Sequence, residues 1–284
     1  MKVLTLILLS TIFCSSIESF SVRHQKLKII TNDEVFDVED EIFDRDRRLI
    51  NANNATDGQF PYSARFSLLR TDGRVTRCSG SIISTNFVLS AGHCIDSRYE
   101  EVTAVRIEVG TSNIDVHRTR VYAEEQWWLD ASELAALDLA IYRLIEHLTF
   151  NSLISSVRLP RQSQRNHEFV GYPSQIIGWG NDNSGSSARI LQYGNYRILS
   201  NTVCDDRFQT FYEMCSIADD WHPELSTQGG DSGGPMVIFE SNIPTQVGIH
   251  VRRRVTGGQN LHVATRVSLF LEFINEITGI PIRD

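Results

Sequence analysis

The spacing of apolar residues from Leu49 onward restricts the fold more than any other feature of the sequence. Short apolar stretches alternate with clusters of glycine, asparagine, aspartate and serine. These stretches are Ser81–Val88, Val105–Val109, Ala140–Leu144, Gln175–Ile177 and Met236–Phe239. Such a pattern predicts many strands and few helices. Helical spacing occurs near the end of the chain, at Ser268–Ile277, where five apolar residues fall on one side.

Composition and charge exclude several classes of protein. The chain has 284 residues, of which 41% are hydrophobic, so it can bury a large core and is not a disordered chain. Its 27 basic and 35 acidic residues leave a net charge of -8, which disfavours nucleic acid as a partner. The eight histidines are scattered without the spacing of metal ligands, so no metal or other cofactor is expected.

The N-terminus has the pattern of a secretory signal. Lys2 precedes the apolar stretch Val3–Phe13, and small residues follow it. This stretch is too short to cross a membrane, and no later run is long enough either. We therefore predict a signal peptide over residues 1–19, a secreted protein without membrane association, and loss of Cys14 with the signal.

The next segment, residues 20–48, is acidic and ends in Arg47-Arg48. It contains no cysteine, glycine, proline or tryptophan. A segment of this composition is not expected to build a core. It is interpreted either as a solvated acidic tail or as a propeptide that ends at a basic cleavage site.

Three short motifs contain residues suited to nucleophilic catalysis. His93 lies in the run Ser90–Cys94, and Asp138 lies among apolar residues at 137–141. A buried carboxylate is costly without a partner, so Asp138 is expected to face a hydrogen-bond donor. Ser232 lies in the run Gly230–Pro235, whose glycines permit a sharp turn with backbone N–H groups beside the serine hydroxyl.

These motifs, in the order His, Asp, Ser, resemble the chymotrypsin/trypsin family of serine proteases. The resemblance covers residues 49–284 and includes three further matches, at Gly58–Pro61, Gly178–Gly180 and Thr265–Val267. It implies an all-β protein of two six-stranded antiparallel β-barrels with a C-terminal α-helix. The active site would lie in the cleft between the barrels.

The resemblance also assigns catalytic roles. Ser232 is the nucleophile of an endopeptidase that works through an acyl-enzyme, and His93 takes and returns its proton. Asp138 orients His93 and stabilises its charged form. The backbone N–H groups of Gly230 and Ser232 form the oxyanion hole.

Activation follows from the same resemblance. Cleavage between Arg48 and Leu49 would create an ammonium group that pairs with Asp231, which makes residues 20–48 a propeptide. The expected partners are protein or peptide substrates, an activating trypsin-like protease and protease inhibitors, with the enzyme itself a monomer. Leu49–Ala52 departs from the usual Ile-Val-Gly-Gly, so a catalytically weak or inactive homologue that acts as a binding protein is the alternative function.

The cysteine pairs are likewise implied by the family. Cys78 would pair with Cys94 across the histidine loop, and Cys204 would pair with Cys215. The family's usual third disulfide, at the substrate pocket, is absent because Gln228 stands where its first cysteine would fall. Separately, Asn54-Ala55-Thr56 is a glycosylation sequon.

The residues aligned with the substrate pocket are unusual. Ser226 stands at the pocket floor where trypsin-like enzymes have Asp, so preference for Lys or Arg before the scissile bond is not expected. Hydroxyl, imidazole and guanidinium groups surround this position and suit a carboxylate; they belong to Thr227, His250, Arg253 and His262. Preference for an acidic residue at this substrate position (P1) is one hypothesis, and preference for a hydrophobic residue is the other. A third alternative is a narrow or blocked pocket. For residues 252–254, the alternative interpretation is a solvated loop tip.

Overall fold

The computed structural model describes most of the chain outside the N-terminal segment and several loops. The described residues are 2–5, 21–30, 33–36, 52–95, 101–116, 119–129, 137–181, 188–204, 211–219, 226–227, 229–256 and 258–284. Arg48 and Leu49, the expected cleavage bond, lie outside these ranges, as do most residues of the predicted signal. Within the described ranges, no helix is long and apolar enough to cross a membrane.

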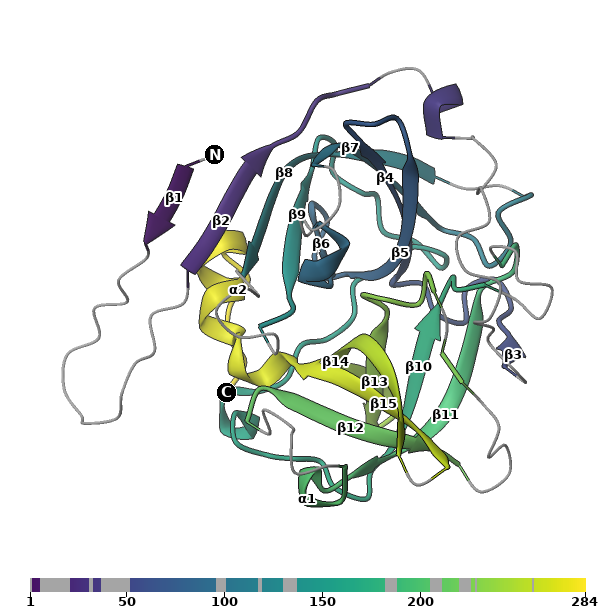
Figure 1. Ribbon diagram of the computed structural model, residues 1–284, viewed down its shortest axis with the longest axis vertical. Helices are drawn as coiled ribbons and strands as arrows, with labels where there is room; N and C mark the ends of the chain where they lie inside the picture. Colours follow the sequence, from purple (N-terminus) through teal and green to yellow (C-terminus); the bar gives the residue numbers. More distant parts are fainter. Residues whose placement is uncertain are drawn as a thin grey trace.

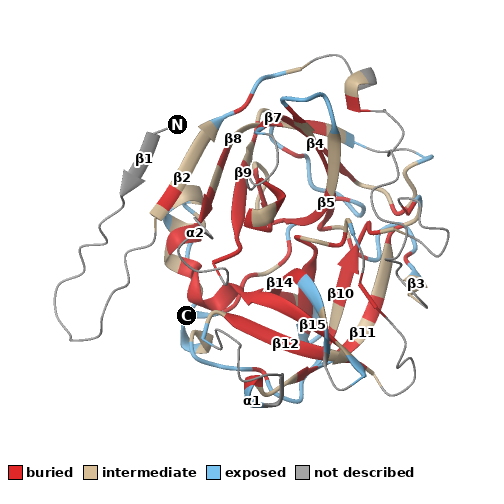
Figure 2. Ribbon diagram, viewed as in Figure 1, coloured by how far each residue is buried: buried red, intermediate tan, exposed pale blue. Residues whose placement is uncertain are grey.

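The first barrel is an antiparallel sheet that closes on itself. Its strands follow the order β8-β7-β4-β5-β6-β9, and β9 pairs back with β8. They are β4 (Ser63–Arg70), β5 (Val75–Ile82), β6 (Phe87–Ser90), β7 (Val102–Val109), β8 (Thr119–Leu129) and β9 (Ala140–Leu144). The strands are largely buried, as Figure 2 shows, because alternate side chains fill a barrel of this size.

The second barrel closes in the same way. Its order is β10-β13-β14-β15-β12-β11, and β11 pairs back with β10. The strands are β10 (Pro173–Gly178), β11 (Gln192–Leu199), β12 (Glu213–Ala218), β13 (Pro235–Glu240), β14 (Ile243–Thr256) and β15 (Gln259–Arg266). The expected fold of two six-stranded barrels is therefore confirmed (Figure 1).

Short helices and two-residue pairings complete the fold. β3 (Asn53–Asn54) pairs with β11, and the small helices are η2 (Gly92–Cys94), η3 (Gln162–Gln164), η4 (Val267–Leu269) and α1 (Asn201–Cys204). The C-terminal helix is α2 (Leu271–Thr278), and its buried residues join the main core cluster, which includes residues of both barrels. The predicted helix at Ser268–Ile277 thus begins as a 3-10 turn, and Gly279 ends α2 in the left-handed conformation.

One local prediction needs correction. The apolar stretch Ser81–Val88 is not one strand, because β5 ends at Ile82 and β6 begins at Phe87. A tight turn joins them, in which the Ser84 hydroxyl accepts hydrogen bonds from the N–H groups of residues 86 and 87. A continuous apolar run does not reveal a turn within it when the residues on both sides of the turn are buried.

The acidic N-terminal segment is packed on the first barrel where it is described. β2 (Ser21–Lys26) pairs antiparallel with β8 and thereby extends the barrel sheet, and β1 (Lys2–Thr5) pairs with the outer edge of β2. The 3-10 turn η1 (Asp33–Phe36) buries Phe36 completely. The expectation that this segment contributes no core is therefore wrong for these residues, since Val22 and Leu27 join the main core cluster.

Candidate active site

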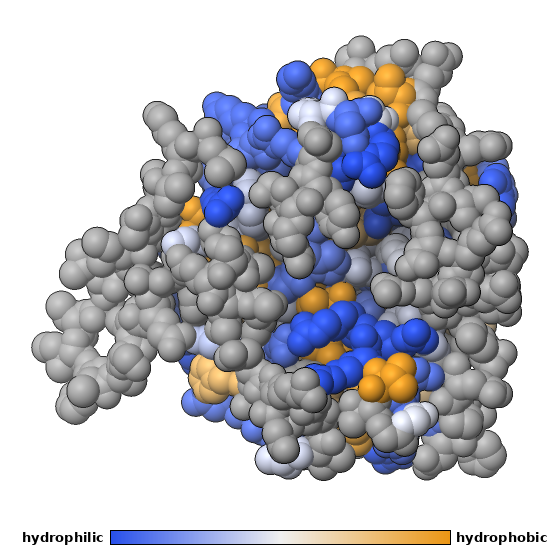
Figure 3. Space-filling model, viewed as in Figure 1, coloured by the Kyte–Doolittle hydropathy of each residue, from blue (hydrophilic) through white to orange (hydrophobic). Residues whose placement is uncertain are grey.

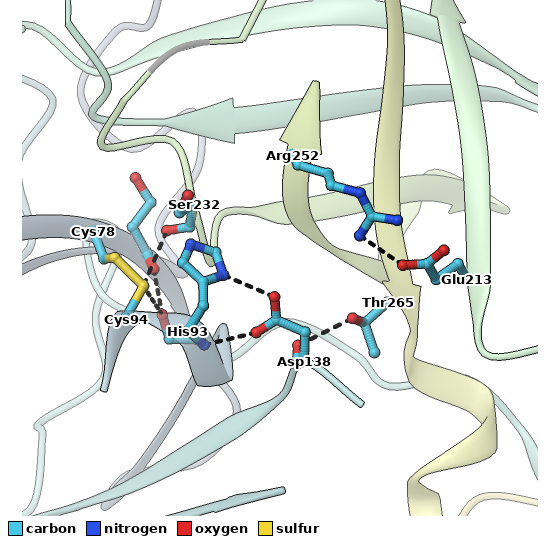
Figure 4. Close-up of polar contacts among 10 residues, drawn as sticks. Cys78, His93, Cys94, Asp138, Glu213, Ser232, Arg252 and Thr265 are labelled. Carbon is cyan, nitrogen blue, oxygen red and sulfur yellow. Dashed lines mark hydrogen bonds and ion pairs between the residues drawn. A yellow bond between two sulfur atoms is a disulfide. The ribbon is translucent and has the colours of Figure 1, made fainter. Parts of the chain in front are cut away.

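His93 and Asp138 meet at the edge of the first barrel. His93 lies on η2, just after β6, and Asp138 lies just before β9, and these two strands are paired. The backbone N–H of His93 donates to Asp138 Oδ1 at 2.8 Å, and His93 Nδ1 lies 2.7 Å from Asp138 Oδ2 (Figure 4). Because Nδ1 donates to the carboxylate, the other ring nitrogen, Nε2, is left to accept a proton.

Asp138 is buried yet held in its charged form. Burial acts to raise the pKa of this carboxyl, but the charge and hydrogen bonds of His93 outweigh it, with a smaller contribution from Arg252, and the pKa is lowered. Thr265 also donates its hydroxyl to the backbone carbonyl of Asp138 at 3.0 Å, which ties the second barrel to this residue. The partner that Asp138 was expected to face is therefore His93.

Ser232 lies on the loop of the second barrel that precedes β13. Its carbonyl oxygen accepts the N–H of Ser79 at 2.8 Å and lies 3.9 Å from Cys94 Sγ, so the loop is packed against the histidine segment. Figure 4 shows Ser232 on the side of the His93 ring that faces away from Asp138. The structure thus brings the three predicted residues together from both barrels.

Glycine is required beside Ser232. Gly233 has φ of +85°, and a Cβ placed there would lie 2.1 Å from Ser90 Oγ and 2.3 Å from Ser79 O. Gly230 also has positive φ, at +94°. These conformations are rarely adopted by other residues, so the glycine-rich motif permits both the turn and the close approach of the two barrels.

Ser79 is a site residue that the sequence did not reveal. Its buried hydroxyl donates to the carbonyl of Gly230 at 2.8 Å and accepts the N–H of Trp179 at 2.8 Å. This bridge holds the peptide group that follows Gly230. In the sequence, the only sign of a role for Ser79 is its position directly after Cys78. This position does not separate Ser79 from the other serines nearby.

Asp231 is buried within the loop that carries Ser232. Its Oδ1 accepts the N–H of Gly180 at 2.8 Å, and both Gly178 and Gly180 approach the carboxylate so closely that a Cβ at either would collide with it. The motif Gly178–Gly180 therefore has a packing role beside Asp231. The expected partner of Asp231, the N-terminus created at Leu49, lies outside the described residues.

The five residues aligned with the substrate pocket form one polar cluster. Arg253 Nη1 donates to Ser226 Oγ at 2.8 Å, and Thr227 Oγ1 lies 2.9 Å from His262 Nδ1. Arg253 and His262 are directly opposite each other in the pairing of β14 with β15, because a bulge between His250 and Arg252 sets this register. The His250 and His262 ring centroids are 6.0 Å apart. Hydrophilic side chains gather over this hairpin in Figure 3.

The ionisation of this cluster is unequal. His250 is buried, and its Nδ1 has no hydrogen-bond partner among the residues that the structure describes. Burial, then the neighbouring His262, His93 and Arg252, hold the pKa of His250 well below its ordinary value. Among the described members, Arg253 therefore supplies a positive charge beside the hydroxyl groups, while His250 is neutral near neutral pH. Arg252, the neighbour of Arg253 in sequence, forms an ion pair with the buried Glu213 at 2.7 Å.

The remaining predicted residues stand as follows. Cys78 and Cys94 form a disulfide, which joins β5 to η2. Cys215 is disulfide-bonded, but for its expected partner Cys204 the structure describes the backbone and not the side chain. Asn54 is exposed on β3, where its side-chain oxygen accepts a hydrogen bond from Gln192 at 3.3 Å. No group of three potential metal ligands occurs within the described part of the chain.

The protein has two closed β-barrels, with a histidine–aspartate pair on the first and a serine beside glycines on the second. This combination defines a protein of the serine peptidase class. The chain belongs to the trypsin family, since the Trypsin family model matches residues 49–274.

Individual relatives agree with this assignment. A collagenase from Hypoderma lineatum is 27% identical over 241 residues, covering 83% of this chain and 89% of that protein. Chymotrypsin-C from Rattus norvegicus is 27% identical, with 81% and 88% covered, and Serine protease 1 from Drosophila melanogaster is 29% identical, with 82% and 86% covered. A solved structure of HL collagenase superposes with a TM-score of 0.70 at 25% identity, covering 82% of this chain and all of that one.

Proposed function

We propose that this protein is a secreted serine endopeptidase, made as a zymogen and activated by cleavage after Arg48. The observation that supports it most strongly is the pair of hydrogen bonds between His93 and Asp138, with Ser232 delivered by the opposite barrel. The signal-like N-terminus and the two cysteine pairs suit an oxidising extracellular environment. Exposed Asn54 is then available as a glycosylation site.

The proposed reaction begins with attack of Ser232 Oγ on the peptide carbonyl. A hydroxyl is a weak acid near neutral pH, so His93 Nε2 must take its proton as the new C–O bond forms. Asp138 stabilises the resulting imidazolium because its lowered pKa keeps it ionised. His93 then returns the proton to the leaving amine, and water releases the acyl group by the reverse sequence of proton transfers.

The oxyanion of the tetrahedral intermediate would accept hydrogen bonds from the N–H groups of Gly230 and Ser232. Each such donor is worth about 10²–10³ in rate. Support comes from the hydrogen bonds of Ser79 and Asp231, which hold the peptide groups of this loop in one conformation. New pairing of Asp231 with the ammonium of Leu49 is the step that would complete the hole after cleavage.

For substrate selection we propose an acidic residue at P1. Arg253 lies on the hydroxyl of Ser226, at the floor of the aligned pocket, so a carboxylate entering there meets a guanidinium and two hydroxyl groups. Such charge-assisted hydrogen bonds are about twice as strong as neutral ones. A hydrophobic P1 side chain would instead cover the exposed Arg253 and remove water from its guanidinium group, which is costly.

The first test separates an enzyme from a homologue without activity. The purified zymogen is cleaved after Arg48 with a trypsin-like protease, the Leu49 terminus is verified by mass spectrometry, and a mixed peptide library is added. We expect cleavage that is absent in Ser232→Ala. A correctly trimmed protein that cleaves no peptide would instead indicate a binding protein with a vestigial triad.

The second test concerns Arg253. Its replacement by alanine should lower kcat/KM for substrates with Glu or Asp at P1 by about 10–100-fold, the value of a hydrogen bond to a charged group. Arg254→Ala, on the opposite face of the same strand, is the matched control and should change the rate little. Faster cleavage after Phe or Leu than after Glu by the unmodified enzyme would contradict the proposed preference.

A further inference from the structure

The acidic segment makes two kinds of contact with the first barrel that do not depend on its covalent link to Leu49. One is strand pairing, in which β2 and β8 run antiparallel from the pair Val22 and Leu129 to the pair Lys26 and Glu125. The pairing continues as the N–H of Leu27 donates to the carbonyl of Glu124 at 2.8 Å. Addition of a strand to a sheet edge is a recognised mode of peptide binding.

Side chains reinforce this strand. Gln25 Nε2 donates to the carbonyl of Val102 at 3.0 Å and to Glu101 Oε1 at 2.8 Å, while Gln25 Oε1 accepts from Gln126 at 2.7 Å. His24 stacks on Trp127 with ring centroids 4.9 Å apart. These interactions join β2 to β7 and β8 together, so the strand is bound specifically.

The second contact is the burial of Phe36. Its side chain is fully buried, with the guanidinium of Arg106 5.1 Å from its ring centre, and Arg77 donates to its carbonyl at 3.1 Å. Arg106 belongs to a group with Arg65 and Arg120 that contacts Glu108. Glu108 thus fixes the guanidinium group that packs on Phe36.

We propose that, after cleavage behind Arg48, the segment from Phe20 to Arg48 stays bound to the catalytic domain as a non-covalent light chain. No disulfide can hold it, because these residues contain no cysteine. The light chain braces β8, whose last residue Leu129 donates its N–H to the carbonyl of Leu139, directly after Asp138. The proposal rests on the zymogen activation described above.

The experiment separates retention from activation. In the full chain carrying Ser232→Ala, which prevents self-digestion, a recognition sequence for a site-specific viral protease is inserted between residues 40 and 47. After cleavage, size-exclusion chromatography and mass spectrometry follow the fragment. We expect equimolar co-elution in native buffer and separation in guanidinium chloride. Recovery of the fragment in the small-peptide fractions of the native column would overturn the proposal, whatever the activity of the natural enzyme.

Two variants test the contacts. Phe36→Ala should raise the released fraction at least tenfold, since it removes the buried anchor, whereas Ile29→Ala should leave it unchanged because this apolar residue is 60% exposed. Equal release from both would contradict the assignment of Phe36. Should Phe36→Ala not fold, hydrogen exchange on the cleaved parent decides: we expect the amides of β8 to stay protected, and their rapid exchange after cleavage would overturn the proposal.

Discussion

At the scale of single residues, the site depends on side chains that bind backbone groups. Ser79 holds the carbonyl of Gly230, Asp231 holds the N–H of Gly180, and Asp138 holds the N–H of His93. Each bond crosses between segments that are distant in sequence. Their common effect is to fix the backbone at Gly230, Gly180 and His93.

Ser79→Ala should lower kcat/KM of the activated enzyme about tenfold. The substitution leaves the Gly230 carbonyl and the Trp179 amide without this partner, a loss of about 1–3 kcal/mol. Ser81→Ala is the control, because Ser81 is buried on the same strand but donates to Gln246. Steady-state kinetics on one peptide would check this, and equal rates for the two variants would show that the Ser79 bridge is dispensable.

His250 should make the fold sensitive to mild acid. Its pKa is held well below the ordinary 6.5 by burial, so below pH 6.5 the unfolded chain binds a proton that the folded chain does not. Stability therefore falls as pH falls, by about 1.4 kcal/mol between pH 7.5 and 5.5 for this one group. Urea unfolding should show a smaller loss over this interval in His250→Gln; an identical loss would mean that other groups cause it.

At the scale of elements, the N-terminal segment behaves as part of the first barrel. β2 lies beside β8 in Figure 1. η1 contacts β4, and its Phe36 packs against Arg106 of β7. The pair Trp127-Trp128 belongs to β8, and Trp127 contacts His24 of the added strand. The sheet therefore continues beyond the six strands that the family requires.

Phe36→Ala in the uncleaved zymogen should lower the free energy of unfolding by about 3–5 kcal/mol, the usual cost of removing a buried aromatic side chain. Ile29→Ala should change it by less than about 0.5 kcal/mol, since Ile29 is mostly exposed. Chemical denaturation followed by far-ultraviolet circular dichroism measures both. Similar small effects would show that η1 does not stabilise the domain.

At the scale of the whole molecule, hydrogen bonds hold the two barrels in a fixed relation at the proposed site. Thr265 of the second barrel binds the backbone of Asp138, and Ser79 of the first binds both Gly230 and Trp179. The proposed activation adds another long-range link, between a new terminus at Leu49 and Asp231. We expect the protein to be active only when these connections are made together.

Asp231→Asn should abolish this activation without preventing cleavage. The amide keeps an oxygen for the Gly180 N–H, but it lacks the charge that an ammonium group requires. We expect normal trimming after Arg48 by mass spectrometry and at least a 100-fold loss of peptide hydrolysis. Full activity in the trimmed variant would show that the Leu49 terminus does not bind Asp231.

Much of the fold could be predicted because its signals are local. The short apolar stretches mark strand positions, as at Ala140–Leu144, which coincides with β9. The sequence could not locate the β5–β6 turn inside Ser81–Val88, since both flanks are buried. It also could not reveal the packing of Phe36, because burial there is created by Arg106 and Tyr122 from other strands.

The sequence by itself determined the chemical groups of the site and their order: His93, Asp138, Ser232 and the glycines around the serine. These motifs are recognisable because each satisfies a local requirement of side-chain chemistry or backbone conformation. Only the tertiary structure decided which groups meet, such as Arg253 with Ser226 or Ser79 with Gly230. Such pairings depend on strand register and barrel closure, which arise from many weak contacts between residues far apart in the chain.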